Sequence, residues 1–185
     1  MATTYKVYAA GQKPQKYTPG DFILTHHDTA PAKVIRLGQF IRYHGDMREY
    51  AHWNHCALVV DEDGTLIEAV GRGVVYGHID EYKDVEYYYV RTKLNEQSRN
   101  QTVAAAKSFL NDKYGWMTIA SITLELLTGI KLQFTNQNTM ICSAVVGQAL
   151  WAGGFIFDSN PYQMMPADLA AAFKVSCFDV LQKKS

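Results

Sequence analysis

The sequence predicts an α+β domain, and three observations carry that prediction. Apolar strand-like segments at 54–60 and 65–70 flank residues 61–64, Asp-Glu-Asp-Gly, which have the composition of a hairpin turn. Segments with helical spacing are interspersed with short strand-like runs. The stretch 138–150 begins polar and becomes an apolar run of helical length. Local antiparallel pairing mixed with helices is typical of the α+β class.

The elements before and after the hairpin follow from the same patterns. Residues 1–19 are polar, contain Pro14 and Pro19, and are expected to form a leading arm. A turn and short strand are expected over 20–25, and a helix over 32–43 with Val34, Leu37 and Ile41 on one face. After the hairpin we expect a strand at 74–76 and a tyrosine-rich strand at 85–91.

The second half of the chain is expected to be mainly helical. Helices are predicted over 95–110, 117–127, 142–151 and 166–173, with a loop over 129–139 and a last strand at 175–181 that buries Cys177. No repeat or low-complexity tract divides the 185 residues. The sequence therefore predicts one domain over 1–185.

Composition limits the classes of function. Apolar residues make up 48% of the chain, which is typical of a globular protein, and 18 basic residues balance 18 acidic ones. Without a basic field, nucleic acid is not expected as a partner. Three cysteines form no disulfide framework, so a reducing compartment is favoured. Residues 1–16 lack a signal-peptide core, and the apolar segment 116–130 is shorter than the ~20 residues that span a bilayer. We expect a protein made in the cytoplasm with no transmembrane segment.

Cys142 stands where the stretch 138–150 changes from polar to apolar, at the predicted first turn of a helix. Unpaired backbone N–H groups and the positive end of the helix dipole favour thiolate there, so the pKa of Cys142 is expected to fall below its free value. Such a thiolate is a candidate nucleophile. Because a free cysteine is also commonly buried in a core, the assignment depends on finding a base.

The hairpin offers that base together with a carboxylate. A two- or four-residue loop makes residue 60 face residue 65, so that paired numbers sum to 125. Side chains two apart share a face, which places His55 and Glu68 on the same side as diagonal neighbours, roughly 7–8 Å apart at the backbone. Cys56 is expected on the opposite face. A bulge in the turn would reverse this parity.

Cys142, His55 and Glu68 therefore make a nucleophile, a base and an orienting carboxylate. A lone histidine is more often structural, and a strand carboxylate is more often solvated. The residues around Glu68 at 66, 67, 69 and 70 are all apolar, however, which is unusual for a solvated charge. This surrounding favours a functional role for Glu68.

Three other interpretations remain open. The histidines at 26, 27, 44, 52, 55 and 78 raise the question of zinc, but no cysteine pair or carboxylate cluster accompanies them, and the sequence favours no metal and no cofactor. The tyrosines at 82, 87, 88 and 89 could form a binding platform, although packing in a sheet is the simpler explanation. A non-catalytic binding module on the same fold is the alternative of another class, and it predicts no reactive thiol.

Four segments occur in one order along the chain. They are Gly20-Asp21-Phe22-Ile23-Leu24-Thr25; His55 with Val59-Val60; Leu66-Ile67-Glu68-Ala69 followed by Gly73-Val74; and Ile141-Cys142-Ser143 followed by Met165-Pro166-Ala167-Asp168-Leu169. In these segments the chain resembles the circularly permuted NlpC-type branch of the papain-like superfamily, the YiiX/YaeF-like group, over residues 19–172. In that group the histidine strand precedes the cysteine helix, the reverse of the papain order.

The resemblance implies a permuted papain-like fold, with a small antiparallel sheet packed on the cysteine helix. It also implies a Cys–His–polar triad, in which Cys142 matches the nucleophile, His55 the base and Glu68 the third member. Two positions depart from the family. Ala144 stands where the family often has Glu, and residues 114–116, Tyr-Gly-Trp, stand where it often has Tyr-Asp-Tyr. These departures leave the pocket shape and the substrate open.

Together these points predict a thiol hydrolase, a cysteine peptidase or amidase that forms an acyl-enzyme. Backbone N–H groups at the helix start, including that of Cys142, are expected to form the oxyanion hole. Ser143 and Tyr114 are further candidates for the oxyanion hole or pocket. The resemblance favours a peptidoglycan-type peptide as substrate. The alternative is a lipid acyl amide or ester, hydrolysed or transferred, as in the related lecithin retinol acyltransferase group.

Peptidoglycan lies outside the membrane, whereas the sequence shows no signal. An enzyme for that substrate would have to be delivered to the cell wall by another system, and the sequence identifies no delivery or immunity partner.

Overall fold

A computed structural model describes residues 4–28, 30–114 and 139–176, and it confirms the α+β class. The main sheet has six antiparallel strands in the order β1-β6-β2-β3-β4-β5. Their bounds are Thr4–Tyr8 (β1), Phe22–Thr25 (β2), His55–Val59 (β3), Thr65–Val70 (β4), Gly73–His78 (β5) and Tyr87–Arg91 (β6). Short strands β7 (Lys113–Tyr114) and β8 (Thr139–Met140) pair in parallel beside it.

Within the described part of the chain, four α-helices pack with the sheet: α1 (Ala30–Arg42), α2 (Glu96–Ser108), α4 (Cys142–Ala152) and α5 (Pro166–Ala172). Three 3₁₀ turns connect the elements: η1 (Gly45–Glu49), η2 (Ile79–Tyr82) and η3 (Pro161–Gln163). Asn95 caps α2 by accepting a hydrogen bond from the backbone N–H of Ser98, and proline opens α5 at its first turn. These helix starts lie close to their predicted places.

The hairpin between β3 and β4 has the register that the sequence predicts. Oδ1 of Asp61 accepts hydrogen bonds from three successive N–H groups of the turn, at 63, 64 and 65. Gly64 has φ +97°, a conformation that favours glycine. Val60 donates its N–H to the carbonyl of Thr65, and Leu58 pairs with Ile67. Paired numbers therefore sum to 125, without a bulge.

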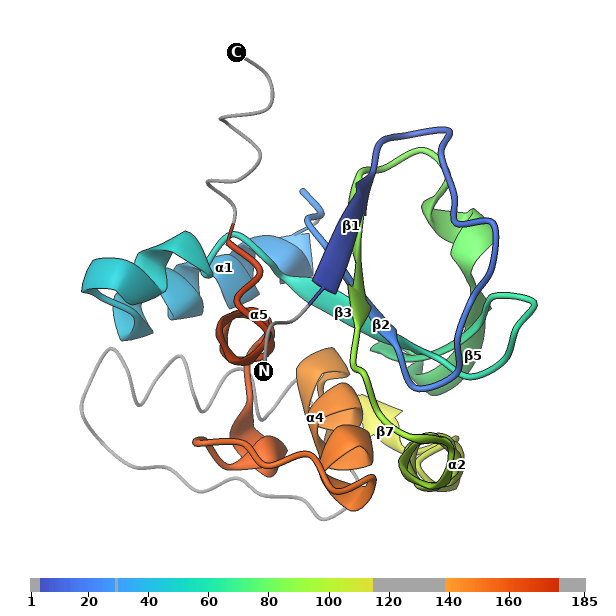
Figure 1. Ribbon diagram of the computed structural model, residues 1–185. Coiled ribbons are helices and arrows are strands. Elements are labelled where there is room, and N and C mark those ends of the chain that lie inside the picture. Colours follow the sequence, from blue (N-terminus) through green and yellow to red (C-terminus); the bar gives the residue numbers. More distant parts are fainter. Residues whose placement is uncertain (1–3, 29, 115–138, 177–185) are drawn as a thin grey trace.

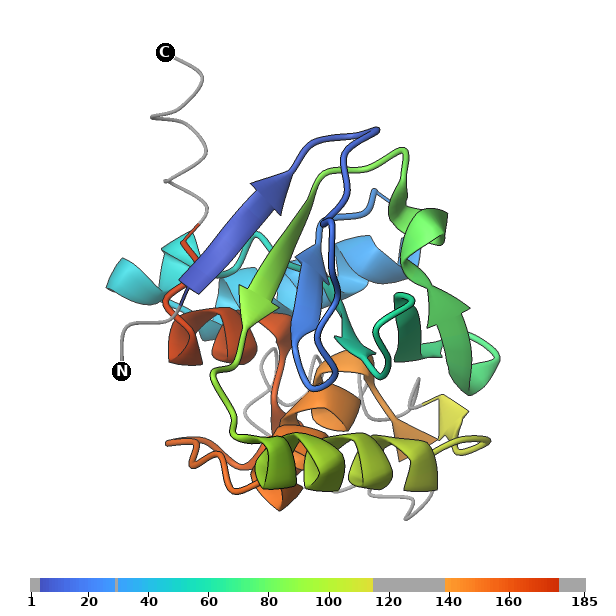
Figure 2. The same ribbon diagram turned by 45° about the vertical axis from the view of Figure 1, so that its right-hand side comes forward.

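The two faces of the sheet have different cores. One face, with Cys56 and Leu58 of β3, packs against a cluster that includes Val145 of α4 and Ala170 of α5. The other face, with Ala57 of β3, packs among buried tyrosines from β1, η2 and β6 and the loop before β2. Figures 1 and 2 show α4 between the sheet and the loop that leads to α5, with α2 alongside it. Residues 142–150 of α4 are all buried, which explains why the helix is apolar all round.

Asp21 fixes the start of β2 against β6 and α2. Its buried Oδ1 accepts hydrogen bonds from the backbone N–H and Oγ1 of Thr92 and from Nη1 of Arg99, at 3.0–3.2 Å. Arg99 also donates from Nη1 to the carbonyl of Pro19. A buried carboxylate with this many donors is well stabilised. The Gly20-Asp21 pair is thus a structural anchor for the strand that lies beside β3.

Two sequence predictions about the first 43 residues are wrong. Residues 4–8 of the expected leading arm form β1, in which Tyr5 and Val7 face Val90 and Tyr88 across the antiparallel pair. Pairing with β6 thus orders residues 4–8, although the polar composition of residues 1–19 had predicted an arm outside the sheet. In α1, Leu37 is 56% exposed, whereas Ala32 and Ile35 are buried. The apolar spacing around Leu37 predicted the helix but not the face that packs inward.

Several predicted segments lie partly or wholly outside the described residues. These are the helix at 117–127, most of the loop at 129–139, and Cys177 with most of the strand at 175–181. The two described residues of that last strand, 175 and 176, are not in a strand. None of the helices in the described part has the length and apolar character needed to cross a membrane.

Candidate active site

Cys142 is the first residue of α4, as the sequence predicts. Ile141 is the N-cap and provides no side-chain hydrogen bond, and the first intrahelical bond runs from the N–H of Val145 to the carbonyl of Ile141. The N–H groups at 142–144 therefore precede the helical hydrogen-bond ladder. The first turn contains no acidic residue. This end of the helix favours a negative charge on Sγ of Cys142.

His55 and Glu68 meet directly. Nε2 of His55 lies 2.7 Å from Oε2 of Glu68, and both side chains are largely withdrawn from solvent. The contact agrees with the register, because the pairs Leu58–Ile67 and Val59–Leu66, continued along the strands, put residue 57 opposite residue 68 and residue 55 diagonal to it. Glu68 is 4% exposed, so the solvated alternative for this carboxylate does not hold.

Tyr82 completes this cluster, and sequence reasoning did not identify it. Its hydroxyl donates to Oε2 of Glu68 at 2.6 Å and lies 2.8 Å from Nε2 of His55. Tyr82 is the last residue of η2, 14 positions after Glu68, so no local periodicity connects the two. The tyrosine-rich composition was the only signal. Tyr82, Tyr87, Tyr88 and Tyr89 are all buried, which excludes the exposed aromatic platform.

Hydrogen bonds and charge set the protonation of Cys142 and His55. A hydrogen bond with the Cys56 thiol is the largest influence on Cys142 and, together with the hydrogen bond and charge of His55, it outweighs burial and holds the pKa of Cys142 well below its usual range. Burial disfavours the charged form of His55, but hydrogen bonds with Cys142 and Glu68 raise its pKa to about 10. Since Nε2 is engaged by Glu68 and Tyr82, Nδ1 is left to serve the thiol. Thiolate and imidazolium are the favoured forms.

Burial and hydrogen bonding have opposite effects on the pKa of Glu68 and the same effect on the pKa of Tyr82. Burial favours the neutral form of Glu68, but the hydrogen bond and charge of His55 and the hydroxyl of Tyr82 hold the pKa of Glu68 below its usual value. Burial and the negative charge of Glu68 raise the pKa of Tyr82. Glu68 is therefore the acceptor and Tyr82 the donor.

Three further histidines lie at this end of the sheet. The ring of His27 is 5.7 Å from that of His55, and the buried amide of Asn54 holds the backbone of His27 through two hydrogen bonds. His26 stacks on His52 at 4.3 Å between ring centroids. Among residues 4–28, 30–114 and 139–176, no three or more His, Cys, Asp or Glu side chains are grouped to hold a metal.

Ser143, the first of the two secondary candidates, does not bring its hydroxyl to the triad. Ser143 is fully buried, and its Oγ donates to the carbonyl of Met164 at 2.6 Å, which ties α4 to the segment before α5. The backbone N–H of Ser143 remains a candidate oxyanion donor, but the hydroxyl has a structural partner. Tyr114 lies on β7 and pairs with Met140, two residues before Cys142.

Solvent exposure does not distinguish the two described thiols. Cys56 is completely buried, and Cys142 is only 1% exposed. Cys177 lies outside the described residues. A difference in reactivity between Cys56 and Cys142 must therefore come from ionisation, since the pKa of Cys56 is raised by burial and by its hydrogen bond to Cys142.

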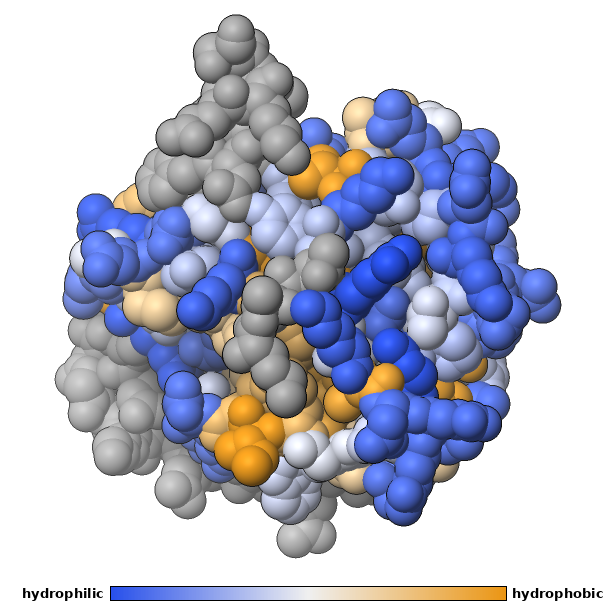
Figure 3. All heavy atoms as spheres, viewed as in Figure 1, coloured by the Kyte–Doolittle hydropathy of each residue, from blue (hydrophilic) through white to orange (hydrophobic). Residues whose placement is uncertain are grey.

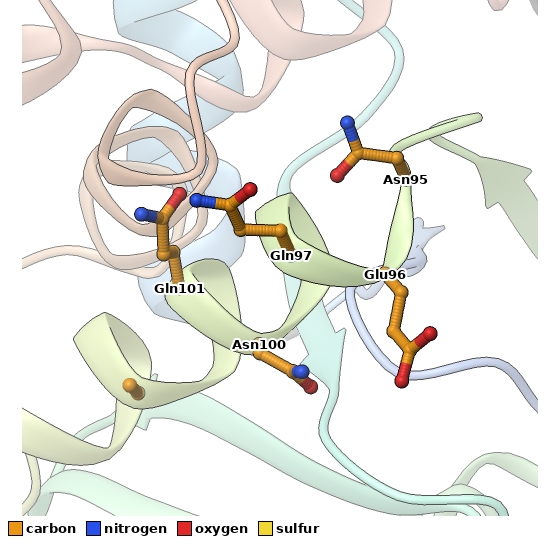
Figure 4. A pocket seen from close by; sticks show the side chains of 6 residues that line it. Asn95, Glu96, Gln97, Asn100 and Gln101 are labelled. Carbon is orange, nitrogen blue, oxygen red and sulfur yellow. The ribbon is translucent and has the colours of Figure 1, made fainter.

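A surface hollow elsewhere on the molecule does not belong to this site. Asn95, Glu96, Gln97, Asn100, Gln101 and Ala104 line it, all from α2 and its cap (Figure 4). None of these side chains is a member of the cluster around His55. The face of the molecule in Figure 3 is mostly hydrophilic, with hydrophobic side chains in small separate patches.

Comparison of the chain with models of known protein families and with curated proteins finds no match to either.

Proposed function

We propose that this protein is a cysteine hydrolase that cleaves an amide bond through Cys142, His55 and Glu68. The observation that carries the proposal is the placement of Cys142 at the first position of α4, beside an imidazole that is itself held by a buried carboxylate. A nucleophile, a base and an orienting group in mutual contact are what acyl transfer requires.

The reaction proceeds through an acyl-enzyme. The Cys142 thiolate attacks the carbonyl carbon, and the oxyanion that forms accepts hydrogen bonds from the N–H groups at 142–144. The His55 imidazolium gives its proton to the leaving amine as the C–N bond breaks. Water then attacks the thioester while neutral His55 takes its proton, and the carboxylic acid leaves as the thiolate returns. Glu68 and Tyr82 hold the ring throughout.

The proposed family is the circularly permuted NlpC-type branch of the papain-like superfamily. The six-stranded antiparallel sheet, the cysteine helix packed on β3 and β4, and the order of the histidine strand before that helix support this assignment. On that basis the proposed substrate is a peptide amide of the peptidoglycan type.

A lipid acyl amide or ester is the second candidate, favoured by the outer face of α1. Leu37 and Phe40, one turn apart, are both about half exposed on a helix that has three basic residues and no acidic one. A basic helix with exposed apolar side chains suits a lipid surface. α1 begins three residues after His27, which lies against His55.

The test is to incubate the protein and its Cys142→Ala variant with purified peptidoglycan fragments and, separately, with acyl-chain phospholipid vesicles. Mass spectrometry of the products identifies the bond. Cleavage of a stem peptide by the wild type alone supports the proposal, and release or transfer of an acyl chain supports the second candidate. A Cys142 thiol that iodoacetamide modifies no faster than a free thiol at neutral pH would instead indicate a non-catalytic binding module.

A further inference from the structure

Cys56 follows His55 in β3, and both residues contact the same thiol. The side chain of His55 points to the face that holds Glu68, whereas Cys56 lies on the opposite face, in the core that α4 covers. Cys56 is completely buried and hydrogen-bonds with Cys142 through its thiol, and its backbone N–H forms a second hydrogen bond to Sγ of Cys142. Two consecutive residues thus approach the nucleophile from the two faces of one strand.

The proton of this thiol pair has one favoured location. Burial and the neighbouring negative charge oppose ionisation of Cys56, so its pKa is raised, while the pKa of Cys142 is lowered. Cys56 therefore keeps its S–H, and Cys142 loses its proton. A thiol is a weak donor to neutral acceptors, but a hydrogen bond to an ionised acceptor is considerably stronger.

We propose that Cys56 is a positioning residue whose S–H donates a hydrogen bond to the Cys142 thiolate and holds it at the start of α4. This inference rests on the proposed function, since it concerns the same nucleophile. The buried S–H is a neutral donor, so it stabilises the thiolate without adding a second positive charge beside His55. Because the thiolate has this second donor, Nδ1 of His55 can turn from Cys142 to the departing amine and deliver its proton there.

A purely structural role makes a different prediction. A buried cysteine that only fills space behaves as a small hydrophobic side chain, so alanine and valine would change stability and leave the ionisation of Cys142 unaltered. Serine keeps a donor in nearly the same place, whereas alanine and valine remove it. The three substitutions at position 56 therefore separate hydrogen bonding from packing.

The experiment measures the rate at which iodoacetamide modifies Cys142 against pH, with peptide mapping to identify the site, in the wild type, Cys56→Ala, Cys56→Val and Cys56→Ser. The midpoint of the rise is expected to move upward by about one pH unit in the Ala and Val variants, because they lose a hydrogen bond to a charged group. Cys56→Ser is expected to stay near the wild-type midpoint. Thermal unfolding of each variant records the packing cost separately.

Superimposed curves for the wild type and whichever of the Ala and Val variants folds would overturn the proposal. A serine variant whose midpoint rises as far as that of the alanine variant would also overturn it. If neither apolar variant folds, the serine variant decides: a midpoint near that of the wild type supports the proposal, and a rise of about one pH unit overturns it. These outcomes do not depend on hydrolysis. If Cys142 ionises at low pH but no substrate is cleaved, the proposed function fails, whereas this inference still stands.

Discussion

His52 and His55 lie three residues apart at the same end of the sheet, yet their environments give them opposite charge states. His52 stacks on His26 and packs edge-on against Trp53, and burial, with the positive charges of His26 and Arg36, lowers its pKa to about 4. His55 is more deeply buried, but hydrogen bonds with Cys142 and Glu68 overcome burial and raise its pKa to about 10.

Burial by itself removes the charge of a histidine, whereas a buried carboxylate and thiolate beside the ring retain that charge. His52 has no carboxylate within hydrogen-bonding distance among the described residues. Glu68 reaches His55 only because β4 pairs with β3 in one register. The functional difference between two histidines of the same segment is therefore created by a neighbouring strand.

The largest expected effect comes from removing each histidine in turn. In His55→Gln the rate of amide cleavage should fall about 10³-fold, because the proton donor and base is lost. The modification of Cys142 by iodoacetamide should then rise at higher pH than in the wild type, because the thiolate loses the hydrogen bond and positive charge of His55. The wild-type pH–rate profile should be a bell. Its acid limb reflects loss of the thiolate and its alkaline limb loss of the imidazolium proton, and both belong to the coupled pair.

His52→Gln is the matched control, since His52 is neutral at working pH and its ring packs against His26 and Trp53. It should leave the modification curve of Cys142 in place. If His55→Gln and the wild type give the same curve, His55 does not act on Cys142, and the catalytic assignment fails.

Glu68→Gln removes the negative charge that helps His55 to keep its proton. Loss of a charged hydrogen-bond acceptor costs about 1.5–3 kcal/mol, so we expect a roughly 10–100-fold lower rate. Because Glu68 raises the pKa of His55, its removal should make the imidazole lose its proton at lower pH and shift the alkaline limb downward. NMR titration of the His55 ring measures this directly.

Glu62→Gln is the control for the carboxylate, because Glu62 is in the hairpin turn and its ion pair with Lys16 is exposed. It should have no measurable effect on rate. A Glu68→Gln variant with the wild-type rate and an unchanged His55 titration would remove Glu68 from the triad.

Much of this arrangement could be predicted because it depends on local patterns. Alternation along the hairpin, together with its four-residue turn, set the parity that places His55 and Glu68 on one side, and the polar-to-apolar change at Cys142 located the helix start. The edge strand β1 was missed because a single strand gains its stability from a partner distant in sequence, here β6.

The contacts that could not be predicted are those that only tertiary packing creates. Tyr82 reaches Glu68 from a 3₁₀ turn, and Cys56 meets Cys142 across the packing of β3 and α4. The low exposure of Cys142 was likewise outside the reach of the sequence, because it depends on what covers the helix start. In each case no spacing along the chain brings the two residues together.

Gly77→Ala displaces the carboxylate without removing it. Gly77 lies on β5 across from β4, and a Cβ at this position would collide with Oε1 of Glu68. We expect the rate to fall about 10-fold, less than in Glu68→Gln, because the carboxylate can remain near His55 with poorer geometry. Gly71→Ala is the control, since a Cβ there meets no atom within 4 Å. Equal rates for the two variants would show that the position of the carboxylate is not critical.

Tyr82→Phe is expected to have the smallest effect. The phenyl ring preserves the packing of the buried side chain, but Oε2 of Glu68 loses one of its donors, which costs about 1 kcal/mol, or roughly a five-fold lower rate.

The direction in which the pH–rate profile moves shows whether Tyr82 acts through Glu68 or through packing. The pKa of Glu68 is held down partly by this hydroxyl, so its loss should raise that pKa, and the carboxylate should be neutralised at higher pH. The acid limb of the profile should therefore move upward, with a larger loss of rate at pH 5 than at pH 8. Tyr76→Phe on β5, where the side chain is half exposed, controls for the loss of a tyrosine hydroxyl. A uniform loss of rate at all pH values would show that Tyr82 acts through packing and not through Glu68.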